Sequence, residues 1–294
     1  MKIGLIGSGY WAESVHCPAL AASNDVEFVG VWGRNHEETQ RLALKFGVDA
    51  YSDLDTLIRD VDALDFAVPP HVQKDIALRA AKAGKHLLLE KPLALNVADA
   101  DELISTFTEA GISTVVFHTT LFQSDIGEWV DAAQGTSWAS GVSEWISDAL
   151  SDPASPFRAS PWRHDRGALW DIGPHVVSLF ISLLGPVTEV VAVAGPADTV
   201  HLVLMHAEGR TSSSTLSLNG PPGQYVFGVR VWNDTTSAQL PESQVDGTEA
   251  LVLALEALAS HAAGKTSVPR SDAAYARDIV AVLDKAQRQL DARQ

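Results

Sequence analysis

The sequence has one cysteine, few basic side chains and no long uninterrupted apolar run. Because Cys17 stands alone among 294 residues, an intramolecular disulfide and a thiolate metal cage are both excluded, as is typical of a reducing cytoplasm. The sequence has 21 Lys and Arg residues but 37 Asp and Glu residues. The resulting formal net charge of -16 would repel a nucleic-acid backbone or an anionic lipid surface. No stretch approaches the ~18 consecutive apolar residues of a membrane-spanning helix. We therefore expect no nucleic acid and no membrane as a partner.

The amino-terminal residues lack the features of an export signal. Residues 1–6 run directly into a buried-strand pattern, without a basic region, a separate apolar stretch or a small-residue cleavage site. This favours a cytoplasmic location. The length exceeds what one hydrophobic core usually organises, and 46% of the residues are hydrophobic, so we expect two globular domains.

Residues 1–119 carry the pattern of a doubly wound parallel α/β domain, the Rossmann fold. Apolar runs alternate with amphipathic helical stretches, which is typical of right-handed βαβ units. We expect strands near 2–6, 26–32, 62–68, 86–90 and 113–118, and helices over 10–22, 35–46, 70–83 and 96–110. Gly84 falls where a helix C-cap belongs.

Residues 120–294 form the expected second domain, of the α+β class. Its first part combines several tryptophans with prolines, which breaks the earlier alternation. Residues 187–240 then read as several long strands separated by Gly, Pro and Asn, and this predicts a mainly antiparallel open sheet. Two helices, over 249–260 and 273–290, close the chain.

A glycine-rich turn follows the first strand. Gly7, Gly9 and Ala12 match the G-x-G-x-x-G/A pattern of dinucleotide-binding sites, with Tyr10 and Trp11 between them. In this pattern the first Gly permits a tight turn, the second lets the pyrophosphate approach the backbone, and the third small residue lets the helix pack against the strand. A plain strand-to-helix turn is the alternative. The position directly after the first strand favours a site for a nicotinamide dinucleotide.

The end of the second strand bears on the choice between NAD(H) and NADP(H). In NAD-specific sites an acidic residue at this place binds the ribose hydroxyls. This chain has Gly33 and Arg34 instead, and a guanidinium can hold a 2′-phosphate through two hydrogen bonds. We therefore expect NADP(H) in preference to NAD(H), with Gly33 and Arg34 in the cofactor site. Arg34 as an ordinary solvated loop residue is the alternative.

Three short motifs occur together within residues 66–95. They are Pro69-Pro70 at a strand end, Ala-Gly-Lys-His over residues 83–86, and Glu90-Lys91-Pro92. On these motifs the chain resembles the Gfo/Idh/MocA family of oxidoreductases. The resemblance implies a catalytic Lys91 that also contacts substrate, a cofactor site that includes Pro69, Pro70, Glu90 and Lys91, and a cis bond between Lys91 and Pro92.

The position of Lys91 fits this role. It follows the fourth strand expected from the pattern, at the carboxyl edge where open α/β sheets place their ligands. Its ammonium can donate a hydrogen bond to a substrate oxygen and offset negative charge that develops there during hydride transfer. Without the resemblance, Lys91 would be interpreted as a solvated lysine at a strand end.

A second group of candidate residues lies in the expected second domain. Asp171 and His175 are four residues apart at a helix start, a spacing that can put a carboxylate and an imidazole on one side. The resemblance implies that both are catalytic and contact substrate, with His175 exchanging the hydroxyl proton and Asp171 orienting it. The alternative is that Asp171 caps the helix. Trp162 and Arg163 occupy the family's usual Trp-Arg position and are candidate substrate-binding residues.

Several positions depart from the family pattern. Gln73 stands where many members have His, Gln123 lies near a usual Arg, and Ser178 stands where an Asp often follows the catalytic His. Arg166-Gly167 replaces a common Gly-Gly pair. These positions can border the substrate pocket, so the substrate of better-known members does not transfer to this chain.

The sequence therefore predicts an NAD(P)-dependent dehydrogenase or reductase. The expected reaction is hydride transfer between the nicotinamide and a carbinol carbon of a sugar, cyclitol or related polyol, without a metal. Two alternatives remain open, namely an NAD-dependent glycosidase of the same fold and a non-catalytic regulatory protein that senses dinucleotide or sugar. The resemblance implies an open sheet face in the second domain that pairs with another subunit, and the apolar strands within 187–240 suit this role, so we expect a homodimer or homotetramer.

Overall fold

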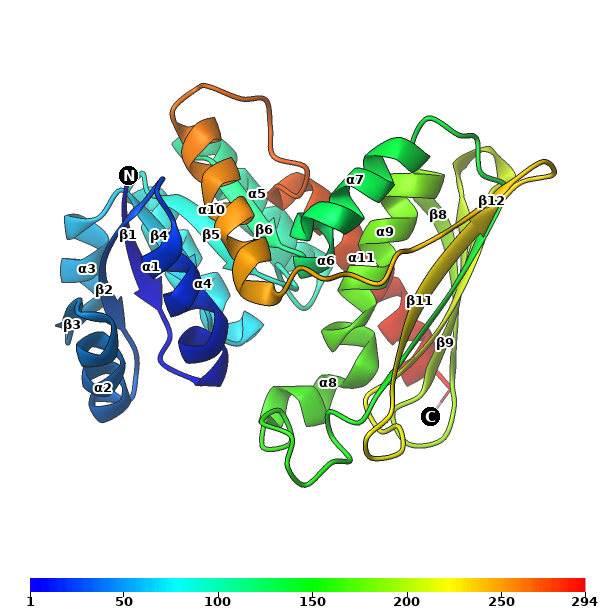
Figure 1. The fold of residues 1–294 in the computed structure, drawn as a ribbon, viewed down its shortest axis with the longest axis horizontal. Coiled ribbons are helices and arrows are strands. Elements are labelled where there is room, and N and C mark those ends of the chain that lie inside the picture. The colour runs from blue at the N-terminus through cyan, green and yellow to red at the C-terminus, as the bar shows by residue number, and fades with distance from the viewer. Residues whose placement is uncertain (294) are drawn as a thin grey trace. The chain divides into compact units, whose positions relative to one another are not determined.

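The computed structural model describes residues 1–293, which form two compact units (Figure 1). Unit 1 comprises Met1–Ser124 and Val245–Arg277, and unit 2 comprises Asp125–Gln244 and the chain from Asp278 onward. The first unit therefore takes in a segment near the carboxyl end that the boundary at residue 119 leaves in the second domain. The last helix, α11 Ala273–Asp291, belongs to unit 1 up to Arg277 and to unit 2 from Asp278.

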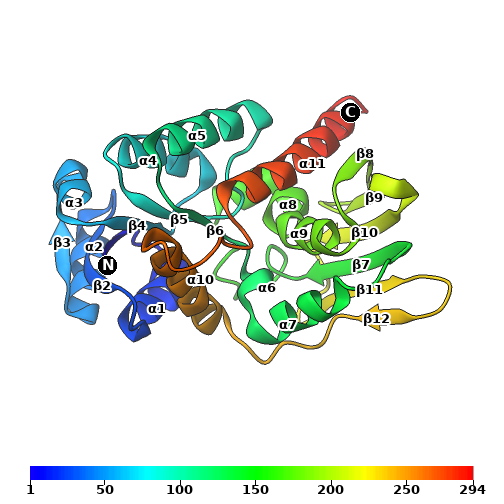
Figure 2. The same ribbon diagram turned by 90° about the horizontal axis from the view of Figure 1, so that it is seen from above.

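Unit 1 is a Rossmann-like domain built on six parallel strands in the order β3-β2-β1-β4-β5-β6. The strands are β1 Lys2–Ile6, β2 Glu27–Trp32, β3 Asp49–Tyr51, β4 Ala63–Phe66, β5 His86–Glu90 and β6 Thr114–Phe117. The helices are the π-helix η1 Ala12–His16, α1 Cys17–Ala22, α2 His36–Phe46, α3 Leu54–Asp60, α4 Pro70–Lys82, α5 Val97–Ala110, α6 Thr119–Phe122 and α10 Gly247–Ala262. Helices α4 and α5 cover one face of the sheet, and α1 and α10 cover the other (Figure 2).

The sequence prediction of this domain is confirmed in its main elements. The five expected strands and four expected helices are present within two residues of their expected bounds, and Gly84 follows the C-cap of α4. Strand β3 and helix α3 were not anticipated, because they are only 3 and 7 residues long. The first expected helix begins as a π-helix, whose wider turn often marks a functional site.

Helix α10 belongs to unit 1 because of its apolar stripe. Five of its residues are almost completely buried and repeat at helical spacing, namely Ala250, Leu251, Ala254, Leu255 and Leu258. They share one core cluster with Ile3 and Leu5 of the first strand. Burial of this stripe against α1, β5 and β6 completes the hydrophobic core of the unit.

Unit 2 contains a second six-stranded sheet in the order β12-β11-β7-β10-β9-β8. Its strands are β7 Ser140–Ser147, β8 Val187–Ala194, β9 Val200–His206, β10 Thr211–Ser217, β11 Tyr225–Trp232 and β12 Ser237–Gln239. All neighbours are antiparallel except β7 and β10, so the expected mainly antiparallel sheet is confirmed. The helical elements are α7 Ser124–Ala133, α8 Pro161–Asp171, α9 Gly173–Leu184, the 3-10 turn η2 Ala207–Gly209 and α11 Ala273–Asp291.

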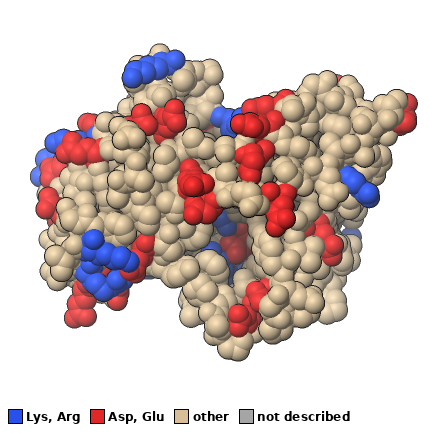
Figure 3. Space-filling view, viewed as in Figure 1, with Lys and Arg blue, Asp and Glu red and all other residues tan. Residues whose placement is uncertain are grey.

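Helices α8 and α9 cover one face of this sheet. Together they form a helical segment of 24 residues, Pro161–Leu184. One 18-residue part of it is apolar enough to span a membrane, but 83% of that part is buried inside the protein. A core helix of a water-soluble fold has this property. On the face of the molecule drawn in Figure 3, acidic side chains are spread widely and basic ones stand in small groups among them, in keeping with the net charge of -16.

Candidate functional site

The glycine turn after β1 has the backbone that its sequence predicts. Gly7 has a φ of +127°, and a Cβ there would lie 2.4 Å from the carbonyl oxygen of Ala67, so only glycine fits. A Cβ at Gly9 would meet no atom within 4 Å, which leaves the backbone open to a close-approaching ligand. Ala12 is fully buried, as a small residue at the third position should be. These features fit a dinucleotide pyrophosphate at Gly9.

The tip of β2 lies beside this turn. A Cβ at Gly33 would lie 2.6 Å from Oγ of Ser8, so glycine lets the tip pack closely against the turn. Arg34 is exposed and makes no hydrogen bond or ion pair within residues 1–293. Arg41, seven residues further along the chain and within α2, is by contrast paired with Glu13 at 2.6 Å. Hydrogen bonds from Arg41 and Lys45 lower the pKa of Glu13 to about 2. The guanidinium of Arg34 is therefore available to an anionic ligand.

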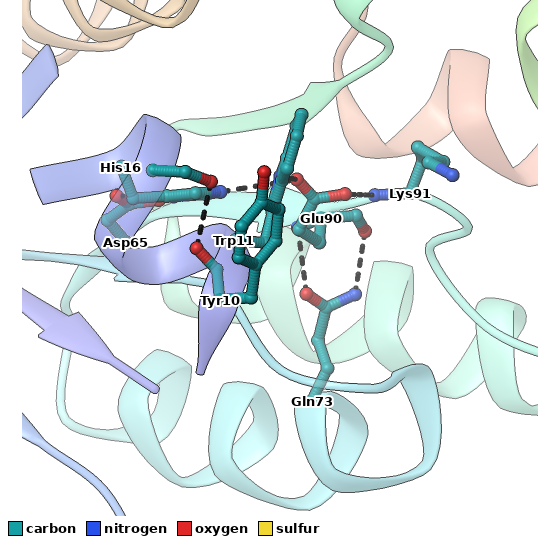
Figure 4. Close-up of polar contacts among 8 residues, drawn as sticks. Tyr10, Trp11, His16, Asp65, Gln73, Glu90 and Lys91 are labelled. Atoms are coloured by element: carbon teal, nitrogen blue, oxygen red, sulfur yellow. Dashed lines mark hydrogen bonds and ion pairs between the residues drawn. The ribbon is translucent and has the colours of Figure 1, made fainter. Parts of the chain in front are cut away.

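A network of polar side chains connects the glycine turn with the end of β5 (Figure 4). The Glu90 carboxylate accepts a hydrogen bond from Nε1 of Trp11 at 2.8 Å and one from the backbone N–H of Lys91 at 3.0 Å. Oε1 of Glu90 also lies 3.3 Å from Nε2 of His16, and Nδ1 of His16 lies 2.8 Å from Oδ2 of Asp65. Glu90 is thus held from both of its carboxylate oxygens.

Gln73 holds the backbone of the same residue. Its amide nitrogen donates to the carbonyl of Glu90 at 2.8 Å, and its amide oxygen accepts from the backbone N–H of Glu90 at 2.8 Å. Gln73 is fully buried in α4, which begins at Pro70 with Pro69 at its N-cap. Gln73, which departs from the family pattern, therefore fixes the backbone at the end of β5 through two hydrogen bonds.

Lys91 stands half-buried directly after this fixed strand end. The Lys91–Pro92 peptide bond is cis, which confirms the expectation drawn from the family resemblance. Burial lowers the pKa of His118 to about 3, and the charge of Lys91 acts in the same direction, so His118 is neutral at pH 7. The buried His118 contacts Oγ of Ser271 at 2.8 Å. Sequence reasoning had assigned no role to His118.

The candidate residues of unit 2 lie where α8 gives way to α9. Asp171 is the last residue of α8, His175 is in the first turn of α9, and each is 6% exposed. Ile172 occupies the N-cap of α9 and no side chain caps that helix, so the alternative of Asp171 as the capping residue is wrong. Oδ2 of Asp171 accepts a hydrogen bond from Nε of Arg163 at 2.8 Å.

Arg163 is fixed on several sides. Its guanidinium lies 4.5 Å from the ring centroid of Phe157 and 4.9 Å from that of Trp162, and Nη1 donates to Oγ of Ser160 at 3.3 Å. Arg163 is thus paired with an acid, Asp171, and its role in substrate binding stays a prediction. Arg163 reaches Asp171 across a kink at Gly167, which has a φ of +61°.

His175 is packed against an aromatic cluster on the inner face of the sheet. The ring of Trp145 lies 5.5 Å from that of His175, and Phe227 lies 4.2 Å from Trp145 on the other side. Ser178 is buried and donates to the carbonyl of His175 at 2.7 Å. The expectation that Asp171 orients His175 stays a prediction.

The candidate residues therefore form two groups. Unit 1 contains the glycine turn, Gly33, Arg34, the two prolines at the start of α4, Glu90 and Lys91, whereas unit 2 contains Trp162, Arg163, Asp171 and His175. His16, Asp65 and Gln73 were not assigned to the site from the sequence. Nothing in the helix of His16 reveals that its partner Asp65 lies 49 residues away in the sequence.

Comparison with known proteins matches both units to models of one protein family. Residues 1–118 match the oxidoreductase family with an NAD-binding Rossmann fold, and residues 142–252 match the GFO/IDH/MocA C-terminal domain. The chain is 32% identical over 241 residues to dTDP-3,4-didehydro-2,6-dideoxy-alpha-D-glucose 3-reductase of Streptomyces violaceoruber, covering 78% of this chain and 67% of the relative.

Solved structures show the same fold at low sequence identity. A dehydrogenase of Bordetella pertussis in complex with NADH and UDP-GlcNAcA superimposes with a TM-score of 0.84 at 20% identity, covering 100% of this chain and 97% of that one. A protein of Desulfitobacterium hafniense described as a putative NADPH-dependent oxidoreductase gives a TM-score of 0.84 at 15% identity, covering 100% and 96%.

Proposed function

The chain belongs to the GFO/IDH/MocA family of oxidoreductases, and we propose that it transfers a hydride between NADP(H) and a carbinol carbon of a sugar, cyclitol or related polyol. The observation that carries the proposal is Lys91, placed after β5 by a strand end that Gln73 and Glu90 hold in position. The pair of buried residues Asp171 and His175 in unit 2 supports it. The single cysteine favours work in the cytoplasm.

Each proposed catalytic residue has a distinct task. A bound nicotinamide supplies the site that accepts or donates the hydride. His175 removes the proton of the substrate hydroxyl as the C–O bond becomes a carbonyl, and returns it in the reverse direction. The ammonium of Lys91 donates a hydrogen bond to the substrate oxygen and stabilises negative charge there. Asp171 orients His175. It also accepts a hydrogen bond from Arg163, which we propose as a substrate-binding residue together with Trp162.

The test is a screen of sugars, cyclitols, keto-sugars and nucleotide-linked sugars with NADP and NADPH, followed by nicotinamide absorbance. We expect substrate-dependent oxidation or reduction of the dinucleotide by the wild-type protein. Cleavage of a glycoside without net absorbance change would support the NAD-dependent glycosidase instead. Dinucleotide binding without turnover of any compound in the panel would contradict the proposal and favour a regulatory protein.

The preference for NADP(H) is proposed from Arg34. Its exposed guanidinium at the tip of β2 has no partner within the described chain, and the tip carries no carboxylate that would bind ribose hydroxyls. We expect Arg34→Ala to raise the Kd of NADPH by roughly 10- to 100-fold and to leave the Kd of NADH nearly unchanged, since a charge-assisted hydrogen bond contributes about 1.5–3 kcal/mol. Titration of both dinucleotides by protein fluorescence measures the ratio.

Arg41→Ala is the matched control for this prediction. Arg41 is also exposed on the same segment but is paired with Glu13 and Glu38, so its loss removes a positive charge without removing an available guanidinium. An equal fall in NADPH affinity in both variants would show that only general charge matters. An unchanged ratio of the two Kd values in Arg34→Ala would contradict the assignment of Arg34.

A second copy of this chain is the partner that we propose for the open face of the sheet in unit 2. The helices of this unit cover one face, while valines of β8, β9 and β11 are 39–44% exposed on the strands, namely Val191, Val193, Val203 and Val226. We expect a dimer or tetramer by light scattering at micromolar concentration, and monomers for Val203→Glu. Val268→Glu, at an exposed valine of unit 1, is the control. A monomeric wild-type protein would contradict the prediction.

A further inference from the structure

His16 is a fully buried histidine with a carboxylate at each ring nitrogen (Figure 4). Nδ1 lies 2.8 Å from Oδ2 of Asp65, and Nε2 lies 3.3 Å from Oε1 of Glu90. An ionised carboxylate only accepts hydrogen bonds, and a neutral imidazole carries a hydrogen on just one nitrogen. Both contacts are satisfied together when the ring is protonated. The geometry thus favours an imidazolium between two carboxylates.

The charges around the ring agree with this assignment. Burial lowers the pKa of His16, but Asp65 and Glu90 outweigh burial and raise it from 6.5 to about 9. Burial also raises the pKa of Asp65, and His16 opposes that change. The neighbouring Cys17 is a neutral thiol, because burial raises its pKa to about 12. The other ring contacts are with uncharged aromatic residues, Trp11 and Phe117.

Glu90 connects this cation to both ends of the cofactor site. Oε1 contacts Nε2 of His16 and accepts from Nε1 of Trp11, which belongs to the glycine turn. Oε2 accepts from the backbone N–H of Lys91. Without a cation beside them, Glu90 and the buried Asp65 would be two carboxylates in one apolar site. One of them would then have to bind a proton or move out of the buried site.

We propose that His16 is a positioning residue. As a buried imidazolium it fixes the Glu90 carboxylate, and this carboxylate fixes two groups: the glycine turn, through Trp11, and the backbone of Lys91. The proposal rests on the proposed function for the catalytic role of Lys91, but the coupling from His16 to Lys91 is measurable without substrate. It assigns His16 to the positioning of Lys91.

The first experiment measures the coupling directly by amide hydrogen exchange. In His16→Asn, whose shorter side chain cannot reach Glu90, we expect the Lys91 amide to exchange roughly tenfold faster or more, while the amide of Leu88 in the middle of β5 is unchanged. His36→Asn, a change at an exposed histidine of α2, is the control and should alter neither amide. Unchanged exchange at Lys91 in His16→Asn overturns the proposal.

A charge-balanced double variant separates positioning from simple destabilisation. His16→Asn leaves Asp65 and Glu90 without their shared cation, and this alone can lower the melting temperature. The added change Asp65→Asn removes one of the two carboxylates, so we expect it to restore most of the melting temperature but not the slow exchange of the Lys91 amide. Recovery of both properties together would show that His16 has a structural role only.

Nitrogen NMR of the His16 ring tests the protonation state. We expect both ring nitrogens to carry hydrogens at pH 7, with deprotonation near pH 9. Because the folded pKa is raised, the contribution of His16 to stability is complete below about pH 6.5 and is lost as the pH rises through about 9. A neutral ring at pH 7 overturns the proposal and leaves the proposed function untouched.

Enzyme kinetics adds a measurement that a purely structural residue would not affect. We expect the alkaline limb of kcat to follow the deprotonation of His16, and Asp65→Asn to move both to lower pH by roughly one unit or more, because the ring loses its nearer carboxylate. If the NMR midpoint of His16 moves in Asp65→Asn but the alkaline limb of kcat stays at the same pH, the proposal is contradicted. A wild-type protein that turns over no substrate contradicts the proposed function, while the exchange measurement still decides the role of His16.

Discussion

Replacing Lys91 with methionine is expected to lower kcat by roughly 100- to 1000-fold, the loss typical when a donor to a developing oxyanion is removed. Methionine keeps the length of the side chain and removes the ammonium. The backbone contact of Lys91 with Glu90 does not involve the side chain, so the strand end should persist. The Kd of the dinucleotide should change much less than kcat. Steady-state kinetics on a substrate found in the screen measures both.

Lys85→Met is the matched control for this variant. Lys85 directly precedes β5 as Lys91 directly follows it, and its ammonium donates to the carbonyl of Val61. A lysine at the opposite end of the same strand should have little effect on kcat. If Lys91→Met retains the wild-type kcat, or if both variants lose activity equally, Lys91 has no catalytic role.

Replacing His175 with asparagine is expected to lower kcat by roughly 100- to 10,000-fold, the range for loss of a general acid or base. Asparagine preserves a polar side chain of moderate size against Trp145 but cannot exchange a proton near neutral pH. The pH dependence of kcat that comes from this histidine should vanish in the variant. Near-UV circular dichroism of the aromatic cluster checks that the surroundings of residue 175 are intact.

His201→Asn provides the comparison for that result. His201 lies on β9 of the same unit and is exposed, and Oγ1 of Thr215, at 3.1 Å from Nδ1, is the one hydrogen-bond partner of its ring among residues 1–293, so its replacement should leave kcat unchanged. Retention of wild-type kcat in His175→Asn would remove His175 from the mechanism. Asp171→Asn should have a smaller effect than His175→Asn, because in the proposed mechanism Asp171 orients His175 and holds Arg163 but does not itself exchange the proton.

Most of the Rossmann unit could be predicted from the sequence because its signals are local. Each strand and helix is a run of residues with its own periodicity, and the glycine turn is a single short motif. The cis bond before Pro92 was predicted from family resemblance, since no local pattern reveals it. The boundary at residue 119 places helix α10 with the second domain, whereas its packing groups it with unit 1. An amphipathic stripe looks the same in either context, and only the tertiary packing shows which core it completes.

The candidate site divides in the same way. Lys91 and the glycine turn stand at strand ends that periodicity locates. The network around Glu90 could not be foreseen, because His16 and Glu90 are 74 residues apart and a histidine within a helix gives no sign of distant carboxylates. Arg163 and Asp171 are close in sequence, but their contact depends on the kink at Gly167, whose backbone the sequence does not display.

The late position of α10 has a consequence for synthesis of the chain on the ribosome. The strands of unit 1 are complete by Phe117, yet five buried side chains of its core arrive only with residues 250–258. A nascent chain must therefore extrude the whole of the second sheet before the first domain can close its hydrophobic surface. The usual order, in which an amino-terminal domain finishes folding while the next is still being translated, is not open to this protein. Unit 1 and unit 2 must therefore complete their folding at almost the same stage of synthesis.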